Sequence, residues 1–463
     1  MSGATTRPTW RRWAPQVEAL RAAIEYRHGK VAAPGVSQHA RLVFMDTVGC
    51  MLAGRRAPEL VAMEAQLAAL EPGAFPMPGG AAFGVHAACR LLAIAPTWHE
   101  ACEGHAFAHG RPGIATIAAL LPLALQREAT VGEFIDAFAV GYEVGARAGG
   151  WLRAAPGLHV DGTWPALGAA AGVARLLGLP VDSAMKAVSI AACQLPSGLY
   201  LPIRTGRNVR NLYLAHSATL GLDCALAAQA GIDAPDDALG WYAEHLSAAA
   251  RGPLPPADAD LLLDAYLKPF AAVRHVHYGA IAARRIRARL QGQPESIHRI
   301  DLSVYQEAAV YCSNPQPATL LAAQFSLSFG LASMLRFGTL DASSYEPPRF
   351  DDPELRRLEA LVEVQIDEAR STRGERGARV HVVSRLGHCE EQVGPDDPDL
   401  LLDAAAAIGK FADAAAPTVL PGASRAFCAA LLQARADMPL RRLWQLLGAG
   451  TSRPSPFANH EGS

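Results

Sequence analysis

The chain has 463 residues, of which 50% are hydrophobic and 19% charged, with a formal net charge of −2. This composition excludes a chain that is disordered over most of its length. The balanced charge argues against a general nucleic-acid binder and a polybasic membrane anchor. No apolar stretch is long enough to span a membrane, and the N-terminus lacks the pattern of a secretory signal. The eight cysteines contain no Cys-x-x-Cys pair. We therefore expect a cytoplasmic protein without a thiolate metal site.

The first 250 residues predict a bundle of helices without a sheet. An apolar stripe with interleaved small residues runs over 42–52, at the spacing of one helix face. Pro112 opens a helix over 113–126, and Thr130 with Glu133 forms a capping box before the next one. Further helices are expected over 164–177, 183–193 and 211–230. The first of these is dense in Gly and Ala, so we expect it to be central and closely packed.

The pattern changes after three prolines at 253–256. Beyond them, apolar spacing predicts helices over 276–290, 320–335 and 358–364, and strands over 299–305 and 379–384. Helices return from Leu400 onward. The predicted fold is mainly α: a large all-helical domain that carries a smaller α+β lid domain. The expected bounds are 1–263 plus 406–450 for the helical domain, 264–405 for the lid and 451–463 for a flexible tail.

The densest polar cluster lies at 98–113. Glu100 and Glu103 are three residues apart, so on a helix their carboxylates share one face. Arg111 precedes the helix that Pro112 opens, where unpaired amides favour an anion. The cluster therefore predicts a site that binds a substrate carboxylate and supplies acid and base groups. Two alternatives remain open here: a solvated surface loop, and a zinc site built from His99, Glu103, His105 and His109.

Three further segments carry candidate site residues. His159 stands in a Pro-Gly-x-His turn before the small-residue helix and is able to act as a general base. A structural histidine, with Asp161 as a helix cap, is the alternative. A loop with Arg207, Asn208 and Arg210 suits carboxylate binding, or is a solvated basic turn. After the proline break, Lys268 precedes His275 and His277, which stand at the start of a helix. The alternative for this segment is a hinge between domains with exposed charges.

In this order and spacing, the motifs resemble the MmgE/PrpD family, which includes 2-methylcitrate dehydratases, cis-aconitate decarboxylases and iminodisuccinate epimerases. The resemblance extends over about 38–447 and rests on collinear segments at 46–54, 111–113, 141–144, 159–178, 314–326 and 410–411. It implies a helical domain with an α+β lid, a homodimer, and a site between the two domains. That site would need no metal or cofactor and would act on a small di- or tricarboxylate.

The resemblance also assigns site residues one at a time. His159, Thr163, Lys268 and His277 match family positions, and Glu103 with Gly104 matches a subgroup. Glu100 stands where the family usually has an aspartate. Family histidines are replaced by Arg111 and Tyr213, a family lysine by Arg210, and an aromatic hydroxyl is lost at Phe270. Arginine keeps the positive charge but does not readily cycle a proton, so a carboxylate other than methylcitrate is expected.

The sequence thus predicts a cofactor-free lyase (a dehydratase or decarboxylase) or an isomerase, acting by general acid–base catalysis. Its expected catalytic residues are His159, Glu100, Glu103, His277 and Lys268, with His159 as the proton-transferring group. Its expected substrate-binding residues are Arg111, Thr163, Arg210, Arg207, Asn208 and Tyr213. The alternatives are a non-catalytic family member that binds a ligand or partner, and a metal-dependent hydrolase using the histidine cluster at 99–109.

Overall fold

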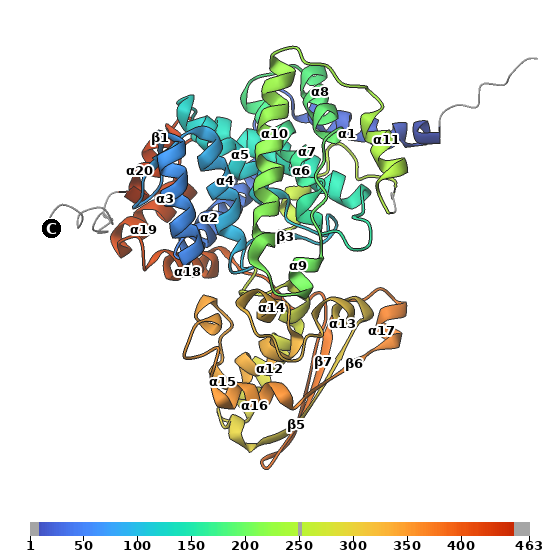
Figure 1. The fold of residues 1–463 in the computed structure, drawn as a ribbon, viewed down its shortest axis with the longest axis vertical. Helices are drawn as coiled ribbons and strands as arrows, with labels where there is room; N and C mark the ends of the chain where they lie inside the picture. The colour runs from blue at the N-terminus through green and yellow to red at the C-terminus, as the bar shows by residue number, and fades with distance from the viewer. Residues whose placement is uncertain (1–8, 249–251, 449–463) are drawn as a thin grey trace, which may run out of the picture.

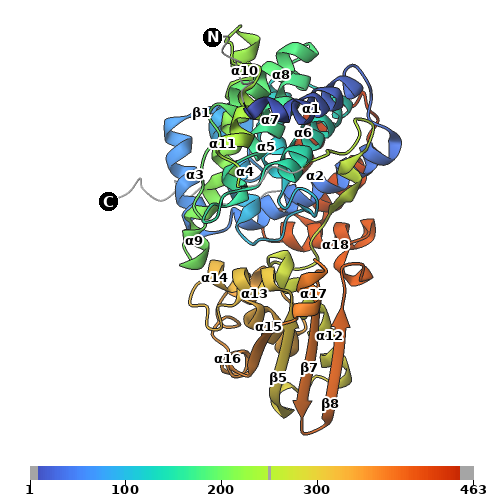
Figure 2. The ribbon, with the colours of Figure 1, turned by 90° about the vertical axis from the view of Figure 1, so that its right-hand side faces the viewer.

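The computed structural model describes residues 9–248 and 252–448. They form two domains, each with a hydrophobic core of its own. Figures 1 and 2 show a broad helical domain above a narrower lid that contains the main sheet. Among the described residues, no helix has the length and apolar character needed to cross a membrane. The mainly α fold with a smaller α+β domain is confirmed.

The N-terminal part of the helical domain is built from eleven helices within the described residues. They are α1 (Ala14–Arg27), α2 (Pro34–Gly54), α3 (Pro58–Leu70), α4 (Val85–Ile94), α5 (Pro112–Gln126), α6 (Val131–Trp151), α7 (Pro165–Leu176), α8 (Val181–Ala192), α9 (Leu201–Arg204), α10 (Tyr213–Gln229) and α11 (Ala238–His245). Short 3-10 helices separate them at η1 (Thr9–Trp13), η2 (Ala95–Thr97), η3 (Val160–Gly162), η4 (Asn208–Leu212) and η5 (Leu261–Asp264).

Close packing of α6, α7 and α10 forms the centre of this domain. The predicted capping box of Thr130 and Glu133 begins α6. A Cβ atom on Gly168 of α7 would lie 2.6 Å from the carbonyl oxygen of Gly141 in α6, so only glycine permits this approach. Residues Pro165–Ala174 of α7 are all buried. The prediction of a central, closely packed small-residue helix is confirmed.

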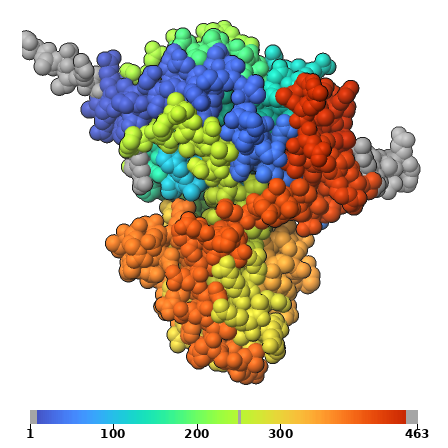
Figure 3. Space-filling view, turned by 180° about the vertical axis from the view of Figure 1, so that it is seen from behind, coloured from blue at the N-terminus to red at the C-terminus, as the bar shows by residue number. Residues whose placement is uncertain are grey.

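The C-terminal helices return to the helical domain. They are α18 (Ala404–Ala415), α19 (Pro421–Gln433) and α20 (Leu440–Gly448), and α18 packs along α2. Figure 3 shows the red C-terminal segment against the blue N-terminal segment, with the orange lid below both. A part-buried ion pair joins α18 to α2, because Nζ of Lys410 donates to Asp46. The helical domain is therefore discontinuous in sequence.

The lid is a four-stranded sheet with helices packed on it. Its strands are β5 (Ile297–Val304), β6 (Val362–Ile366), β7 (Ala378–Ser384) and β8 (Gly387–Val393), in the order β6-β5-β7-β8. β5 is parallel to β6 and antiparallel to β7. The lid helices are α12 (Arg274–Arg289), α13 (Gln306–Cys312), α14 (Leu320–Gln324), α15 (Leu327–Phe337), α16 (Pro353–Ala360) and α17 (Glu368–Thr372), with short η6 (Pro294–Ser296), η7 (Ala342–Tyr345) and η8 (Pro398–Leu400).

The structure corrects three local predictions. The first 250 residues do contain strands: β1 (Pro72–Pro76) pairs with β2 (Ala82–Phe83), and β3 (Gly104–His105) pairs with β4 (Ala265–Tyr266). The predicted helix over 358–364 is wrong, because α16 ends at Ala360 and the following residues form β6. The predicted helix over 320–335 is interrupted at Phe325–Ser326. These strands are short or pair with distant segments, so local periodicity did not reveal them. The predicted flexible tail lies outside the described residues.

Candidate active site

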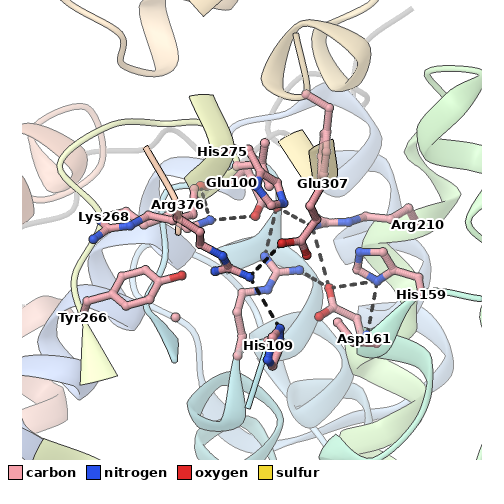
Figure 4. Close-up of a pocket in the computed structure, with 17 residues that line it drawn as sticks. Glu100, His109, His159, Asp161, Arg210, Tyr266, Lys268, His275, Glu307 and Arg376 are labelled. Atoms are coloured by element: carbon pink, nitrogen blue, oxygen red, sulfur yellow. Dashed lines mark hydrogen bonds and ion pairs between the residues drawn. The ribbon is translucent and has the colours of Figure 1, made fainter. Parts of the chain in front are cut away.

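A cavity of about 130 Å³ lies where loops of the helical domain meet the lid. Both domains contribute polar side chains to its wall, as Figure 4 shows. The helical domain supplies Glu100, His109, Arg111, His159, Asp161 and Arg210. The segment that leads into the lid, and the lid itself, supply Tyr266, Lys268, Arg274, His275, Glu307, Phe325 and Arg376. Interdomain clefts lined by convergent polar groups are common enzyme sites.

Glu100 forms the centre of a buried ionic cluster on one side of the cavity. Its Oε1 accepts a hydrogen bond from Nζ of Lys268 at 2.7 Å. Its Oε2 accepts from Arg111 at 3.1 Å and also from Arg210. Burial by itself would raise the pKa of Glu100, but the three cations outweigh it and hold that pKa well below the usual range. Glu100 is therefore ionised and does not supply a proton at neutral pH.

The backbone at Glu100 is in the left-handed region, with φ of +53°. A non-glycine residue there costs about 1–2 kcal/mol, and such strain gathers at functional sites. The loop is held in place because the Glu100 carbonyl accepts a second hydrogen bond from Nζ of Lys268 at 3.0 Å. The same lysine thus fixes both the side chain and the backbone of this loop.

His159 and Asp161 lie on the opposite wall from Lys268 (Figure 4). Nδ1 of His159 accepts a hydrogen bond from the backbone N–H of Asp161 at 3.2 Å, so the neutral ring carries its hydrogen on Nε2. The Asp161 carboxylate, which also pairs with Arg111, lies 3.7 Å from Nδ1. Burial lowers the pKa of His159 to about 4. The ring is therefore neutral near pH 7, with Nε2 left for a ligand.

The lid adds a second group of charges. Nη2 of Arg376 donates to Glu307 at 3.2 Å and contacts Nδ1 of His109, from the helical domain, at 3.5 Å. His275 shares a hydrogen bond with the hydroxyl group of Tyr305, and burial lowers the pKa of His275 to about 4. Burial would raise the pKa of Glu307, but His275 and Arg376 lower it on balance.

Two predicted catalytic residues lie away from the cavity wall. Glu103 is buried, and its carboxylate accepts hydrogen bonds from the backbone N–H of Gly113 at 2.8 Å and the hydroxyl group of Tyr142 at 3.3 Å. It thus occupies one amide at the N-terminus of α5, where the sequence had predicted a substrate anion. His277 is also buried, and its Nε2 bonds to the carbonyl oxygen of Ala272 at 3.0 Å.

Four predicted substrate-binding residues do not reach the cavity either. Arg207 and Asn208 are exposed, and the Asn208 amide donates to Glu59 at 3.1 Å. Tyr213 donates to the carbonyl oxygen of Leu199 at 2.8 Å, and Thr163 to that of Val160 at 2.7 Å. The cavity does gather Arg111 and Arg210, with Glu100, His159 and Lys268 from the predicted catalytic set.

The alternative metal site is not assembled by the fold. Nε2 of His105 bonds to the Leu261 carbonyl oxygen at 2.9 Å, and its Nδ1 accepts from the Ala108 N–H at 3.2 Å. Both nitrogens are thus engaged by the backbone. No group of three or more His, Cys, Asp or Glu side chains in the part of the chain that the structure describes has the geometry to hold a metal ion.

Several wall residues were not assigned to the site from the sequence. Asp161 was weighed only as a helix cap, and Tyr266, Glu307, Phe325 and Arg376 were not singled out. Tyr266, Glu307 and Arg376 lie in segments without a motif of their own, whereas Asp161 and Phe325 lie in motif segments that gave them no place in the site. The fold brings all five residues to the cavity wall. His275 was noticed beside His277, but the family resemblance favoured His277. Helix spacing explains the difference, because positions two apart point to different sides of α12.

Comparison with protein-family models agrees with this architecture. Residues 23–245 match the MmgE/PrpD N-terminal domain and residues 270–428 match the MmgE/PrpD C-terminal domain. The boundary between the two matches falls at the segment that joins the helical domain to the lid. A comparison with curated proteins found no match.

Proposed function

Because the chain belongs to the MmgE/PrpD family, we propose that it is a cofactor-free lyase or isomerase. It acts next to a carboxylate of a small di- or tricarboxylic acid, by general acid–base chemistry. The observation that best supports this proposal is the charge of the interdomain cavity. Five cationic side chains and three carboxylates line it, which gives an excess of two positive charges while the histidines are neutral. A substrate with two carboxylates balances that excess.

The cationic wall suits chemistry at a carbon next to a carboxylate. When a base removes a proton from that carbon, the electron pair moves into the neighbouring carboxylate and adds negative charge to its oxygens. Fixed positive groups in a water-poor site stabilise such charge strongly. From that intermediate, loss of hydroxide as water gives dehydration, and return of the proton to the other face gives epimerisation. In decarboxylation, the bond to the departing carbon dioxide breaks instead, and its electron pair stays on the substrate carbon. An acid then delivers a proton to that carbon.

We assign the proton transfer to His159. Its Nε2 makes no hydrogen bond to the residues that the structure describes. In the arrangement seen here, Nδ1 accepts from a backbone N–H and Nε2 carries the hydrogen. A small rotation, together with a change to the tautomer that carries its hydrogen on Nδ1, would let Nδ1–H donate to the Asp161 carboxylate, now 3.7 Å away. Nε2 would then be able to accept a proton. A bound dianion would favour the resulting imidazolium. Asp161 thus orients the ring in the way that a carboxylate orients other catalytic histidines.

The remaining roles follow from position. Lys268 and Arg111, held by Glu100, present positive charge to the substrate. Glu100 is a positioning residue, because three cations surround its carboxylate. Glu103 and His277 do not line the cavity, and we assign them no proton transfer.

The proposal is tested with a panel of aconitate, citrate, itaconate and aspartate derivatives. Product formation is followed by NMR, and exchange of the proton next to the carboxylate is followed in heavy water. Exchange detects proton abstraction even when no net product forms. The account expects at least one acid to show turnover or enzyme-dependent exchange. A folded protein that binds carboxylates but exchanges no proton would indicate a non-catalytic family member instead.

A further inference from the structure

The cations of the helical wall are already committed to partners within the protein. Arg111 donates to Glu100 and Asp161. Arg210 donates to Glu100, the Thr97 carbonyl oxygen and the Asn211 side chain. A substrate carboxylate that used these arginines would have to displace carboxylates that are buried beside them. These arginines therefore act on a ligand through their charge, and the ligand needs hydrogen-bond donors from elsewhere in the cavity.

Arg376, in the lid, has such donors. Both of its side-chain contacts, to Glu307 and to His109, use the same nitrogen, Nη2. Within residues 9–248 and 252–448, Nε and Nη1 make no hydrogen bond to protein. The side chain lines the cavity and is 24% exposed. Figure 4 shows the guanidinium group between Tyr266, Glu307 and His109. Two of its three nitrogens are thus available to an anion that enters the cavity.

The backbone beside Arg376 is fixed. Gly377 has φ of +155°, and a Cβ atom there would lie 2.5 Å from the carbonyl oxygen of Val393, so this turn requires glycine. Arg370, which is buried, directs its Nη1 at the carbonyl oxygen of Arg376 at 3.4 Å. The loop therefore presents Arg376 at a defined place before β7 begins at Ala378.

We propose that Arg376 binds one carboxylate of the substrate across Nη1 and Nη2, and that in the ligand-free protein Glu307 occupies the Nη2 half of that place. This inference rests on the proposed function, because it assumes a carboxylate substrate. A guanidinium fork matches a carboxylate in a planar, two-bond arrangement. The Glu307 side chain is 41% exposed and pairs with Arg376 through one oxygen, so it is able to turn away when a ligand arrives. Arg376 therefore determines which acids bind, because it requires a carboxylate on the part of the acid that lies against the lid.

The test compares Arg376→Gln with Arg373→Gln. Arg373 is a matched control three residues away: it is exposed and pairs with Glu375 outside the cavity. The probe is whichever of succinate, tricarballylate and aconitate binds the wild-type protein most tightly by calorimetry. Loss of a charge-assisted pair predicts about 10-fold or weaker binding for Arg376→Gln, and unchanged binding for Arg373→Gln. With a turned-over acid, KM should rise by more than kcat decreases.

A second variant tests the role of Glu307 in the opposite direction. Glu307→Gln removes the competing carboxylate, so it should bind the probe as tightly as wild type or more tightly. If it binds as weakly as Arg376→Gln, the assignment of Glu307 as a stand-in is wrong. If Arg376→Gln binds the probe normally while the wild type still catalyses exchange, this inference is overturned and the proposed function stands. If the wild-type protein binds none of the three acids and exchanges the proton of no acid in the wider panel, both are overturned.

Discussion

Lys268 and Glu100 are joined twice: Nζ of Lys268 donates to the Glu100 carboxylate at 2.7 Å and to its carbonyl oxygen at 3.0 Å. Lys268 lies just beyond β4, on the way into the lid, and Glu100 lies in a loop of the helical domain. This pair therefore ties the lid's entry segment to the most strongly ionic wall of the cavity. It also explains why a non-glycine residue is held at φ of +53°.

The first prediction concerns Glu100→Gln. This change leaves Arg111, Arg210 and Lys268 without their shared carboxylate in a buried site. Removing one partner of a buried ion pair costs about 3–5 kcal/mol. We expect a clear loss of stability in urea unfolding, together with a large loss of turnover. Glu133→Gln is not a matched control because it breaks a helix cap, whereas Glu18→Gln, at an exposed position of α1, is suitable and should behave as wild type.

The same residue predicts a dependence of stability on pH. Because the pKa of Glu100 is held well below its usual range in the folded protein, its contribution is present above the pKa of the unfolded chain. The contribution is lost as pH falls through the folded pKa. Unfolding free energies measured by urea titration should therefore decrease on acidification more steeply for wild type than for Glu100→Gln. Parallel curves below pH 4.5 would contradict the ionic assignment.

A third prediction contrasts two arginines from one loop. Arg210 is buried and pairs with Glu100, whereas Arg207 is exposed. Arg210→Ala should abolish turnover and also destabilise the fold, because it removes a positive charge from a buried cluster. Arg207→Ala should change neither. Equal effects of the two substitutions on KM would support the sequence-based view that the whole loop binds substrate.

Glu103 supports a fourth prediction, in which stability changes with pH in the opposite direction. Burial raises the pKa of Glu103 to about 7, so the folded protein holds this proton more tightly than the unfolded chain does. The stability it gives is fully present below the unfolded pKa and is lost as pH rises through about 7. Glu103→Gln lacks this loss. Relative to wild type, the variant should therefore become more stable between pH 5 and pH 8, by about 1–3 kcal/mol.

The activity of Glu103→Gln separates its two possible roles. Its carboxylate bonds to Gly113 and Tyr142 and does not line the cavity. We therefore expect turnover within a few-fold of wild type at pH 7. A loss as large as that of His159→Gln, in a protein that remains folded, would restore Glu103 to the proton-transfer chemistry.

Local signals in the sequence were sufficient for much of the helical domain. Pro112 and the Thr130–Glu133 box predicted the starts of α5 and α6, because helix caps depend on neighbouring residues alone. The return of the chain to the helical domain at α18 was also predicted, from the helical pattern after Leu400. By contrast, β6 was predicted as helix, since its residues are stabilised by pairing with β5, more than 50 positions away. Propensity yields to such tertiary pairing.

The site shows the same division. Glu100, Arg111, His159, Arg210 and Lys268 were found because charged or histidine-bearing motifs mark them, and all five line the cavity. Arg376 lies in a polar run that resembles any solvated loop, and only the fold carries it to His109, 267 positions away. The ion pair between Arg111 and Asp161 also could not be predicted from the sequence. Sequence patterns therefore identified the chemical groups but not which of them neutralise one another.

The fifth and central prediction is the role of His159. His159→Gln retains a polar side chain of similar size but does not cycle a proton near neutral pH. Loss of general acid–base catalysis reduces rates by about 10²-fold or more. His277→Gln serves as the comparison, because His277 is a histidine of the same protein that bonds to Ala272 away from the cavity wall.

The most direct measurement is the rate at which the proton next to the substrate carboxylate exchanges in heavy water, followed by NMR for wild type, His159→Gln and His277→Gln. Binding of the same acid, measured by calorimetry, confirms that each site is occupied. The account predicts that His159→Gln binds the acid but exchanges at about one hundredth of the wild-type rate or less, with His277→Gln much closer to wild type. Exchange by His159→Gln at the wild-type rate would contradict it.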